Sequence, residues 1–259
     1  MLTEVKGLVI RTVDLKESDR LLTIFTEEMG VVTALARGAR TLKSRKMSST
    51  MQFCYSAFVL SKRDDKYTVK DAELIESFFG IRDSIERLAL ASYIADVLSD
   101  VTTAESDRDL LRLSLNSLYA VSTDKYPLSL VKAAFEIRAT SILGFMPDVL
   151  ACASCGTDKG EFFFDIMGGN ILCSECRKRQ KREEIPDPED RERRIIRILS
   201  ESAQKALGYC VHAPLERLFS FKLTEEDARL FSLVAEDYLV NQLERSFKTL
   251  DFYNRVKRD

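Results

Sequence analysis

The pattern of apolar residues changes once along the chain, near residue 80, and this change constrains the fold class. Before it, short runs with strand-like alternation are separated by turn residues, which predicts strands at 5–13, 20–26, 31–36, 53–60 and 67–76. After it, apolar residues recur at helical spacing, which predicts helices at 81–101, 106–119, 128–143, 191–207 and 224–247. The sequence therefore predicts an α+β protein, with a five-stranded β domain at 1–80 and a helical domain at 81–259.

Composition agrees with two ordered domains. The 259 residues are 45% hydrophobic and 31% charged, which is enough apolar material for cores and excludes a disordered chain. Strand periodicity does not separate a barrel from a sandwich, or an SH3-like barrel from an OB-fold. No apolar stretch reaches the roughly 18 residues of a membrane span, and the start of the chain lacks the pattern of a signal or transit peptide. We expect a soluble intracellular protein.

Four of the six cysteines form two Cys-x-x-Cys pairs, Cys152 with Cys155 and Cys173 with Cys176, separated by 17 residues. Each two-residue gap lets a tight turn aim two thiolates at one tetrahedral ion, so this spacing predicts a four-cysteine zinc site. The alternatives are two disulfides, a redox pair or an iron–sulfur cluster, and disulfides fit an intracellular chain poorly. Four protein ligands leave no open position, so we expect one structural zinc ion in a ribbon at about residues 150–177.

The sequence lacks the motifs of common enzymes. There is no G-x-x-x-x-G-K-[ST] and no G-x-G-x-x-G. The one histidine, His212, has no supporting motif, and a zinc deaminase would need a His-x-Glu partner for its cysteines. Cys54 and Cys210 stand alone and are interpreted as buried core thiols. We expect no catalytic residues and no enzymatic activity.

Positive charge is concentrated in two short runs, residues 37–46 and 177–182, each with five cations. The net charge is −2, but outside these runs 29 basic and 41 acidic residues give −12. A loop between barrel strands can contact successive phosphates, so the first run predicts a phosphate-binding site at Arg37, Arg40, Lys43, Arg45 and Lys46. The second run is either a second contact or the solvated start of a linker.

The chain resembles the bacterial RecO recombination and repair proteins in segments that occur in the same order. In the β domain these segments are Gly7–Arg11, Glu17–Thr26, Gly30 and Ala36–Arg40. Further along they are Phe135–Arg138, Leu143–Phe145, the two cysteine pairs and Leu243–Phe252. The resemblance spans nearly the whole chain and is only generic from Arg177 to Leu207.

This resemblance implies an OB-fold followed by a helical domain with an inserted zinc ribbon. It implies a cytoplasmic, nucleoid-associated mediator of the RecFOR pathway of recombinational repair after DNA damage. Such a protein binds single- and double-stranded DNA, anneals complementary strands, and helps load RecA onto strands coated with single-strand-binding protein (SSB). The implied partners are RecR and the C-terminal tail of SSB.

The resemblance also gives the basic residues roles. The first basic run becomes a DNA-binding site, with Arg11 and Arg20 as further candidates. Arg245 and Lys248, in the predicted C-terminal helix, are candidates for binding the acidic SSB tail. An alternative function is a zinc-ribbon adaptor that recruits proteins and binds nucleic acid incidentally. A zinc-dependent hydrolase or deaminase is a third possibility, which a closed four-cysteine site opposes.

Overall fold

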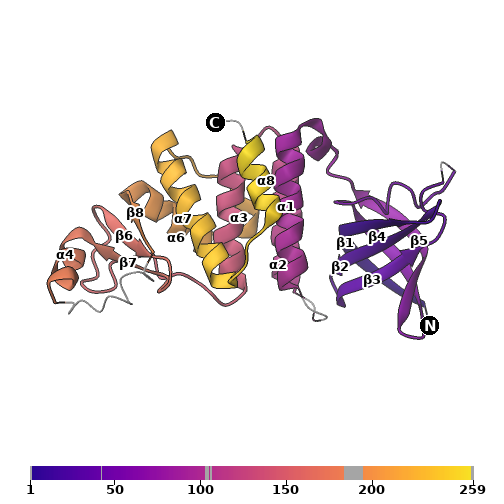
Figure 1. The fold of residues 1–259 in the computed structure, drawn as a ribbon, viewed down its shortest axis with the longest axis horizontal. Helices are drawn as coiled ribbons and strands as arrows, with labels where there is room; N and C mark the ends of the chain where they lie inside the picture. The colour runs from indigo at the N-terminus through magenta and orange to yellow at the C-terminus, as the bar shows by residue number, and fades with distance from the viewer. Residues whose placement is uncertain (1, 42, 103–104, 106, 184–194, 258–259) are drawn as a thin grey trace. The chain divides into compact units, whose positions relative to one another are not determined.

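Figure 1 shows the fold in a computed structural model, which describes residues 2–41, 43–102, 105, 107–183 and 195–257. Contacts between Cα atoms divide the chain into two compact units. The barrel unit comprises Met1–Lys125 and Phe247–Asp259, and the ribbon unit comprises Tyr126–Ser246. In the part of the chain so described, no helix is long and apolar enough to cross a membrane.

The first five strands close into a barrel (Figure 1). They are β1 (Leu2–Leu15), β2 (Asp19–Thr26), β3 (Gly30–Ala36), β4 (Tyr55–Arg63) and β5 (Lys66–Glu76). Their order around the barrel is β1-β2-β3-β5-β4, and only the β3–β5 pair is parallel. This is an OB-like barrel, so the predicted five-stranded barrel is confirmed.

Alternating burial explains why these segments form strands. Along β4 every second residue from Ser56 to Leu60 is buried, so one face points into the barrel and the other toward its surface. The barrel core consists of Val5, Val9, Leu22, Ile24, Val32, Ala34, Ala36, Ala39, Phe58, Leu60, Val69 and Ala72. The strand predicted from residue 53 begins at Tyr55, because Phe53 has a left-handed φ of 68° that ends regular strand geometry.

The rest of the barrel unit is helical. It contains a 3-10 helix (Phe79–Asp83), α1 (Ile85–Val101), α2 (Arg108–Ser122) and α8 (Lys248–Val256). Side chains cap two of them: Ser84 accepts from the Arg87 N–H, and Asp107 accepts from the Leu110 N–H. Ser106, at which the sequence predicted helix α2 to begin, lies outside the described residues.

Helix α8 packs on α1, although more than a hundred residues separate them in the sequence (Figure 1). The rings of Tyr93 and Phe247 meet edge to face, with centroids 5.8 Å apart. The Thr249 hydroxyl donates to the Asp96 carboxylate at 2.7 Å. The C-terminal helix is therefore part of the barrel unit.

The ribbon unit joins a helical layer to a small sheet (Figure 1). Its helices are α3 (Leu128–Ile142), α4 (Ser174–Glu183), α6 (Glu201–His212), a 3-10 turn (Leu215–Arg217) and α7 (Glu225–Leu243). Its strands are β6 (Phe162–Asp165), β7 (Asn170–Cys173) and β8 (Ile196–Leu199), in the order β7-β6-β8. Helix α3 packs on α6 and α7, and the apolar side of the sheet includes Phe162 and Phe164, which are fully buried.

A buried ion cluster joins α3 to α7. The Lys132 ammonium lies 2.8 Å from a Glu136 carboxylate oxygen and 2.7 Å from a Glu236 carboxylate oxygen. Lys132 and Glu136 are almost fully buried. Burial acts to lower the pKa of Lys132, but the two carboxylates outweigh it and raise that pKa, so the lysine is charged.

Two predicted helices are wrong in part. The segment 191–207 is not one helix, because Ile196–Leu199 is strand β8 and the helix α6 begins only at Glu201. The β-branched Ile196 and Ile198 suit a strand, and β8 pairs with β6. The predicted helix 224–247 ends at Leu243, because Glu244 adopts a left-handed φ of 51° as its C-cap.

Candidate metal centre and nucleic-acid interface

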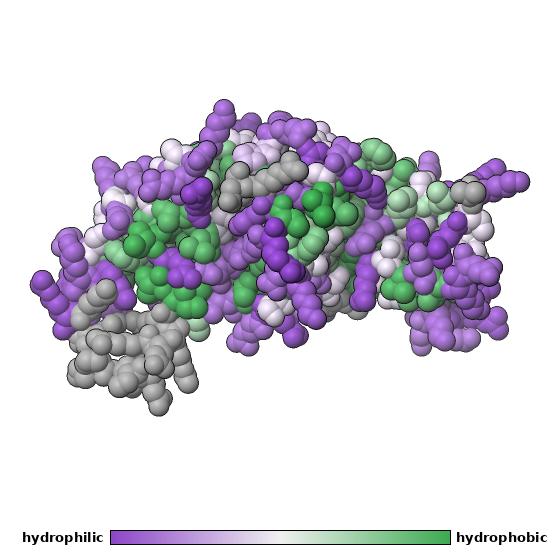
Figure 2. All heavy atoms as spheres, turned by 45° about the horizontal axis from the view of Figure 1, so that its top comes forward, coloured by the Kyte–Doolittle hydropathy of each residue, from purple (hydrophilic) through white to green (hydrophobic). Residues whose placement is uncertain are grey.

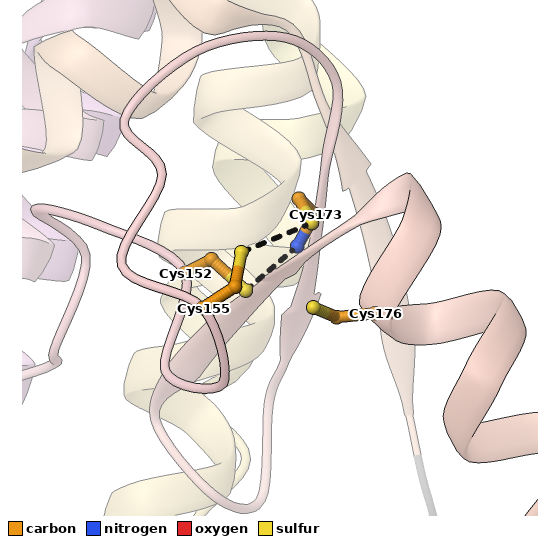
Figure 3. Close-up of side chains that lie close together, drawn as sticks. All are labelled: Cys152, Cys155, Cys173 and Cys176. Atoms are coloured by element: carbon orange, nitrogen blue, oxygen red, sulfur yellow. Dashed lines mark hydrogen bonds between the residues drawn. The ribbon is translucent and has the colours of Figure 1, made fainter.

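The four paired cysteines converge at the base of the ribbon (Figure 3). Their sulfur atoms all lie within 4.8 Å of one another. Cys152 and Cys155 lie on a turn that Gly156 closes with a φ of 75°, its N–H donating to the Cys152 carbonyl at 2.8 Å. Cys173 is the last residue of β7, and Cys176 lies in the first turn of α4. The two pairs thus come from a turn and from a strand–helix junction.

The spacing of the sulfurs fits a tetrahedral metal ion. With zinc–sulfur bonds of about 2.3 Å, tetrahedral geometry places sulfurs roughly 3.8 Å apart. The Cys155 and Cys173 sulfurs are 3.7 Å apart, too far for a disulfide, and all six cysteines are free thiols. Thiolates favour soft or borderline metals such as zinc and iron. The four cysteines can therefore hold a metal ion.

The metal-free thiols differ in how readily they lose a proton. Burial alone would raise the pKa of Cys152, but N–H groups of Cys173, Cys155 and Ser154 together lower it to about 6. For Cys155, the Thr157 N–H acts to lower the pKa, yet the neighbouring cysteine side chains raise it to about 11. The metal-free cluster thus favours a thiolate at Cys152, and a metal ion that bound here would have to displace the proton of Cys155.

Cys54 and Cys210 are separate from this cluster. Both are buried, with 1% and 0% of their surface exposed, so the prediction of core thiols is confirmed. Burial raises the pKa of each thiol, an effect that Arg82 opposes at Cys54 and Arg138 at Cys210. His212 is exposed at the end of α6, away from the four paired cysteines in sequence.

The first basic run forms a loop between β3 and β4, here called the cationic loop (residues 37–46). Arg37, Lys43 and Arg45 are exposed, and none of their side chains forms an ion pair with any residue that the structure describes. Gly38 has a φ of 62°, which lets the chain turn away from the barrel directly after Arg37. Lys46 is half-buried and donates to the Arg37 carbonyl at 3.0 Å. Three cations of this loop are thus available to a ligand.

Two of the predicted DNA-binding arginines, Arg20 and Arg40, have partners within the protein. Arg20 and Arg40 both contact the Asp14 carboxylate, at 3.0 and 3.3 Å. Arg40 also donates to the Lys16 carbonyl at 3.2 Å, and Arg20 to the Thr50 carbonyl at 3.2 Å. Arg40 therefore fastens the cationic loop to the β1–β2 hairpin, whereas Arg20, which lies on β2, joins this hairpin to Thr50 beyond the loop.

The remaining barrel candidate is Arg11, which is exposed on β1. The hairpin also supports the loop through its backbone, since the Gly38 N–H donates to the Asp19 carboxylate at 2.8 Å. Sequence analysis missed Asp14 and Asp19. The role of Asp14 could have been inferred only from its pairing with Arg20 across β1 and β2.

The second basic run is helical rather than an irregular linker. It lies on α4 directly after Cys176. Lys178 pairs with Glu175 at 3.0 Å, and Arg177 donates to the Gln180 side chain at 2.9 Å. Arg179 contacts the cysteine cluster. The acidic connector that follows, with its prolines, lies outside the described residues.

Arg245 and Lys248 are exposed, but they do not share a helix as predicted. Arg245 follows the left-handed Glu244 that ends α7, and Lys248 opens α8. Arg245 therefore lies in the non-helical segment between α7 and α8, and Lys248 lies in the first turn of α8. The two side chains do not line one helical face.

An OB-like barrel, flanking helices and a four-cysteine ribbon define a class of multidomain OB-barrel proteins. Two family models match the chain: "Recombination protein O N terminal" over residues 1–78 and "Recombination protein O C terminal" over residues 82–251. The chain belongs to the RecO family of DNA repair proteins.

Curated relatives agree with this membership. The chain is 39% identical over 255 residues to the DNA repair protein RecO of Acetivibrio thermocellus, covering 97% of this chain and 96% of that protein. It is 28% identical over 254 residues to the RecO of Caldicellulosiruptor saccharolyticus, covering 97% and 98%. It is 32% identical over 178 residues to the RecO of Alkaliphilus metalliredigens, covering 68% and 72%.

Proposed function

We propose that this protein is a non-enzymatic recombination mediator that binds single- and double-stranded DNA and anneals complementary strands. It also helps load RecA onto single strands coated with SSB. One observation carries the proposal: Arg37, Lys43 and Arg45 extend from an OB-like barrel of a RecO chain without ion pairs to described residues. Side chains of this kind bind phosphates without reading sequence.

The mechanism needs few protein groups. The cationic loop neutralises phosphates and so lowers the repulsion between two strands, while base pairing supplies the sequence recognition. Anchoring of the loop through Asp14 and Asp19 holds the cations in place before DNA binds, which reduces the entropy lost on binding. Figure 2 shows that hydrophilic side chains predominate on the barrel in that view. Neither the neutralisation of phosphates nor the base pairing consumes a nucleotide.

We propose a division of labour between the domains predicted from the sequence. Residues 1–80 bind DNA, and residues 81–259 bind protein partners and carry the ribbon at about 150–177. The ribbon holds one zinc ion through Cys152, Cys155, Cys173 and Cys176. When bound, zinc cross-links the turn before β6 to the β7–α4 junction, which is a structural role.

The proposed partners are RecR and the C-terminal tail of SSB, with a functional link to RecA. The acidic SSB tail needs a basic surface, and the exposed Arg245 and Lys248 are candidates for it. The place of action is the cytoplasm, at the bacterial nucleoid.

Removing the three cations of the cationic loop that form no ion pair with a described residue should reduce the salt dependence of DNA binding. Each phosphate contact on a single strand contributes about −0.7 to the slope of log affinity against log salt concentration. The variant Arg37→Ala/Lys43→Ala/Arg45→Ala should therefore have a slope shallower by about 2. Fluorescence anisotropy with a labelled single-stranded oligonucleotide across a salt series measures it.

A variant with three cations removed from the ribbon unit, Lys159→Ala/Lys222→Ala/Arg229→Ala, is the matched control, because it changes the net charge equally. Its slope should stay near that of the wild type. Equal flattening in both variants would show that net charge, rather than the cationic loop, determines binding.

Annealing of complementary oligonucleotides coated with SSB, without ATP, tests the mediator function. The wild-type protein should accelerate annealing, and the cationic-loop variant should lose most of the acceleration. If the folded wild-type protein bound DNA and SSB but failed to anneal the strands, a protein-interaction adaptor would be the better description.

A further inference from the structure

Arg179 on α4 contacts both halves of the cysteine cluster. Its Nη2 donates to the Ser154 hydroxyl at 2.8 Å and approaches the Cys176 sulfur at 3.6 Å. Ser154 lies between Cys152 and Cys155, within the first Cys-x-x-Cys turn, and Cys176 belongs to the second pair. One guanidinium group therefore bridges the two turns that present the four sulfurs.

Helical geometry explains this arrangement. Residues three apart on a helix lie on the same face, so Arg179 reaches back to Cys176 one turn earlier. Other side chains of the basic run point to neighbours on α4 itself: Lys178 to Glu175 and Arg177 to Gln180. Arg179, by contrast, is directed to the cysteine turns.

The charge of a loaded site makes such a contact favourable. Four thiolates around a divalent ion leave a net charge of −2, and hydrogen bonds from charged donors to the sulfurs offset it. The Cys173 N–H already donates to the Cys152 sulfur at 3.3 Å (Figure 3). The Arg179 guanidinium provides the corresponding donor, with a full positive charge, to the sulfur of the opposite pair.

We propose that Arg179 is a positioning residue of the metal centre: it holds the Cys176 sulfur against the Ser154 turn and balances the negative charge of the bound ion. The inference rests on the proposed metal site. It assigns this member of the second basic run to the ribbon rather than to DNA. Both contacts come from Nη2, whose two N–H bonds have fixed directions in the plane of the guanidinium group, whereas the N–H bonds of a lysine ammonium rotate freely.

Zinc affinity of the full-length chain, measured by competition with a chromogenic chelator, tests the proposal. Loss of a partner that hydrogen-bonds to a metal ligand commonly weakens metal binding 10- to 100-fold. We expect Arg179→Ala to weaken zinc binding by about 10- to 100-fold, and Ser154→Ala to weaken it less. Arg179→Lys should restore only part of the affinity, because it keeps the charge without the fixed N–H directions of the guanidinium group.

Lys178→Ala is the matched control, since it removes one positive charge from the adjacent position without touching the cysteine turns. It should bind zinc within about twofold of the wild type, because its ion pair with Glu175 is exposed. Single-strand DNA affinity of Arg179→Ala, measured with zinc saturating, should equal that of Lys178→Ala.

Two outcomes would overturn the proposal. If Arg179→Ala and Ser154→Ala both bind zinc as tightly as Lys178→Ala, Arg179 does not position the site. If wild-type protein binds no zinc, the proposed metal site itself fails, and this inference fails with it. Because Ser154→Ala removes only one exposed hydroxyl group, its zinc affinity tests the proposal even if Arg179→Ala does not fold.

Discussion

Replacing Lys132 by methionine is expected to lower the free energy of unfolding by about 3–5 kcal/mol, the usual cost of breaking a buried ion pair. Methionine keeps most of the volume, so the loss comes from charge rather than from a cavity. The Glu136 carboxylate, which is 0% exposed, would lose the ammonium 2.8 Å away and retain its desolvation penalty. Unfolding in urea, followed by circular dichroism at neutral pH, measures the change.

Two further variants give this prediction its controls. Lys205→Met breaks the exposed ion pair with Glu201 and should change stability little. The double variant Lys132→Met/Glu136→Leu removes the two buried charges, leaves only the partly exposed Glu236 carboxylate, and should recover part of the loss. A Lys132→Met protein as stable as Lys205→Met would show that the cluster contributes little to the fold.

Replacing both cysteines of the second pair, as Cys173→Ser/Cys176→Ser, is expected to abolish zinc binding and to unfold the ribbon locally. Structural zinc binding contributes about 10–16 kcal/mol in small zinc-finger peptides, so a ribbon of short strands depends on it strongly. Elemental analysis should find zinc in the wild type and none in the variant. Hydrogen exchange should become fast in β6 and β7 while the barrel keeps its protection.

The control is Cys54→Ala, which alters a buried thiol of the barrel unit and should leave zinc content unchanged. Chelator treatment of the wild-type protein should reproduce the exchange pattern of the double variant. Unchanged protection of β6 and β7 after zinc removal would contradict a structural role for the metal.

The five strands of the barrel could be predicted from the sequence because their signal is local, whereas closure into an OB-like barrel was implied only by the family resemblance. Alternation of buried and exposed residues along β3 and β4 is visible in a few residues, and turn residues mark most strand ends. The start of β4 differs from the prediction by two residues, since nothing in the sequence marks the left-handed backbone at Phe53. The spacing of the two cysteine pairs is equally readable, because each chelating turn lies within four residues.

The features that the sequence did not reveal depend on distant partners. Strand β8 is followed closely in the sequence by helix α6, so the helical pattern extends over it. Its pairing with β6 selects the extended conformation. Arg20 and Arg40 look like free cations in the sequence, but the barrel brings both to Asp14. Arg179 is one of five similar charges, and only the helix that begins at Ser174 directs it to Cys176. Composition gives the number of cations, but the fold determines which of them remain available to a ligand.

The packing of α8 on α1 has a consequence for the order of folding during synthesis. The barrel strands are complete once residue 76 has left the ribosome, and they can close early. The α1 surface that receives Phe247 and Thr249 stays uncovered while residues 126–246 are made. The whole ribbon unit is therefore synthesised before the last helix can pack on α1. Of the described elements, the barrel unit thus contains both the earliest in the sequence, β1, and the latest, α8.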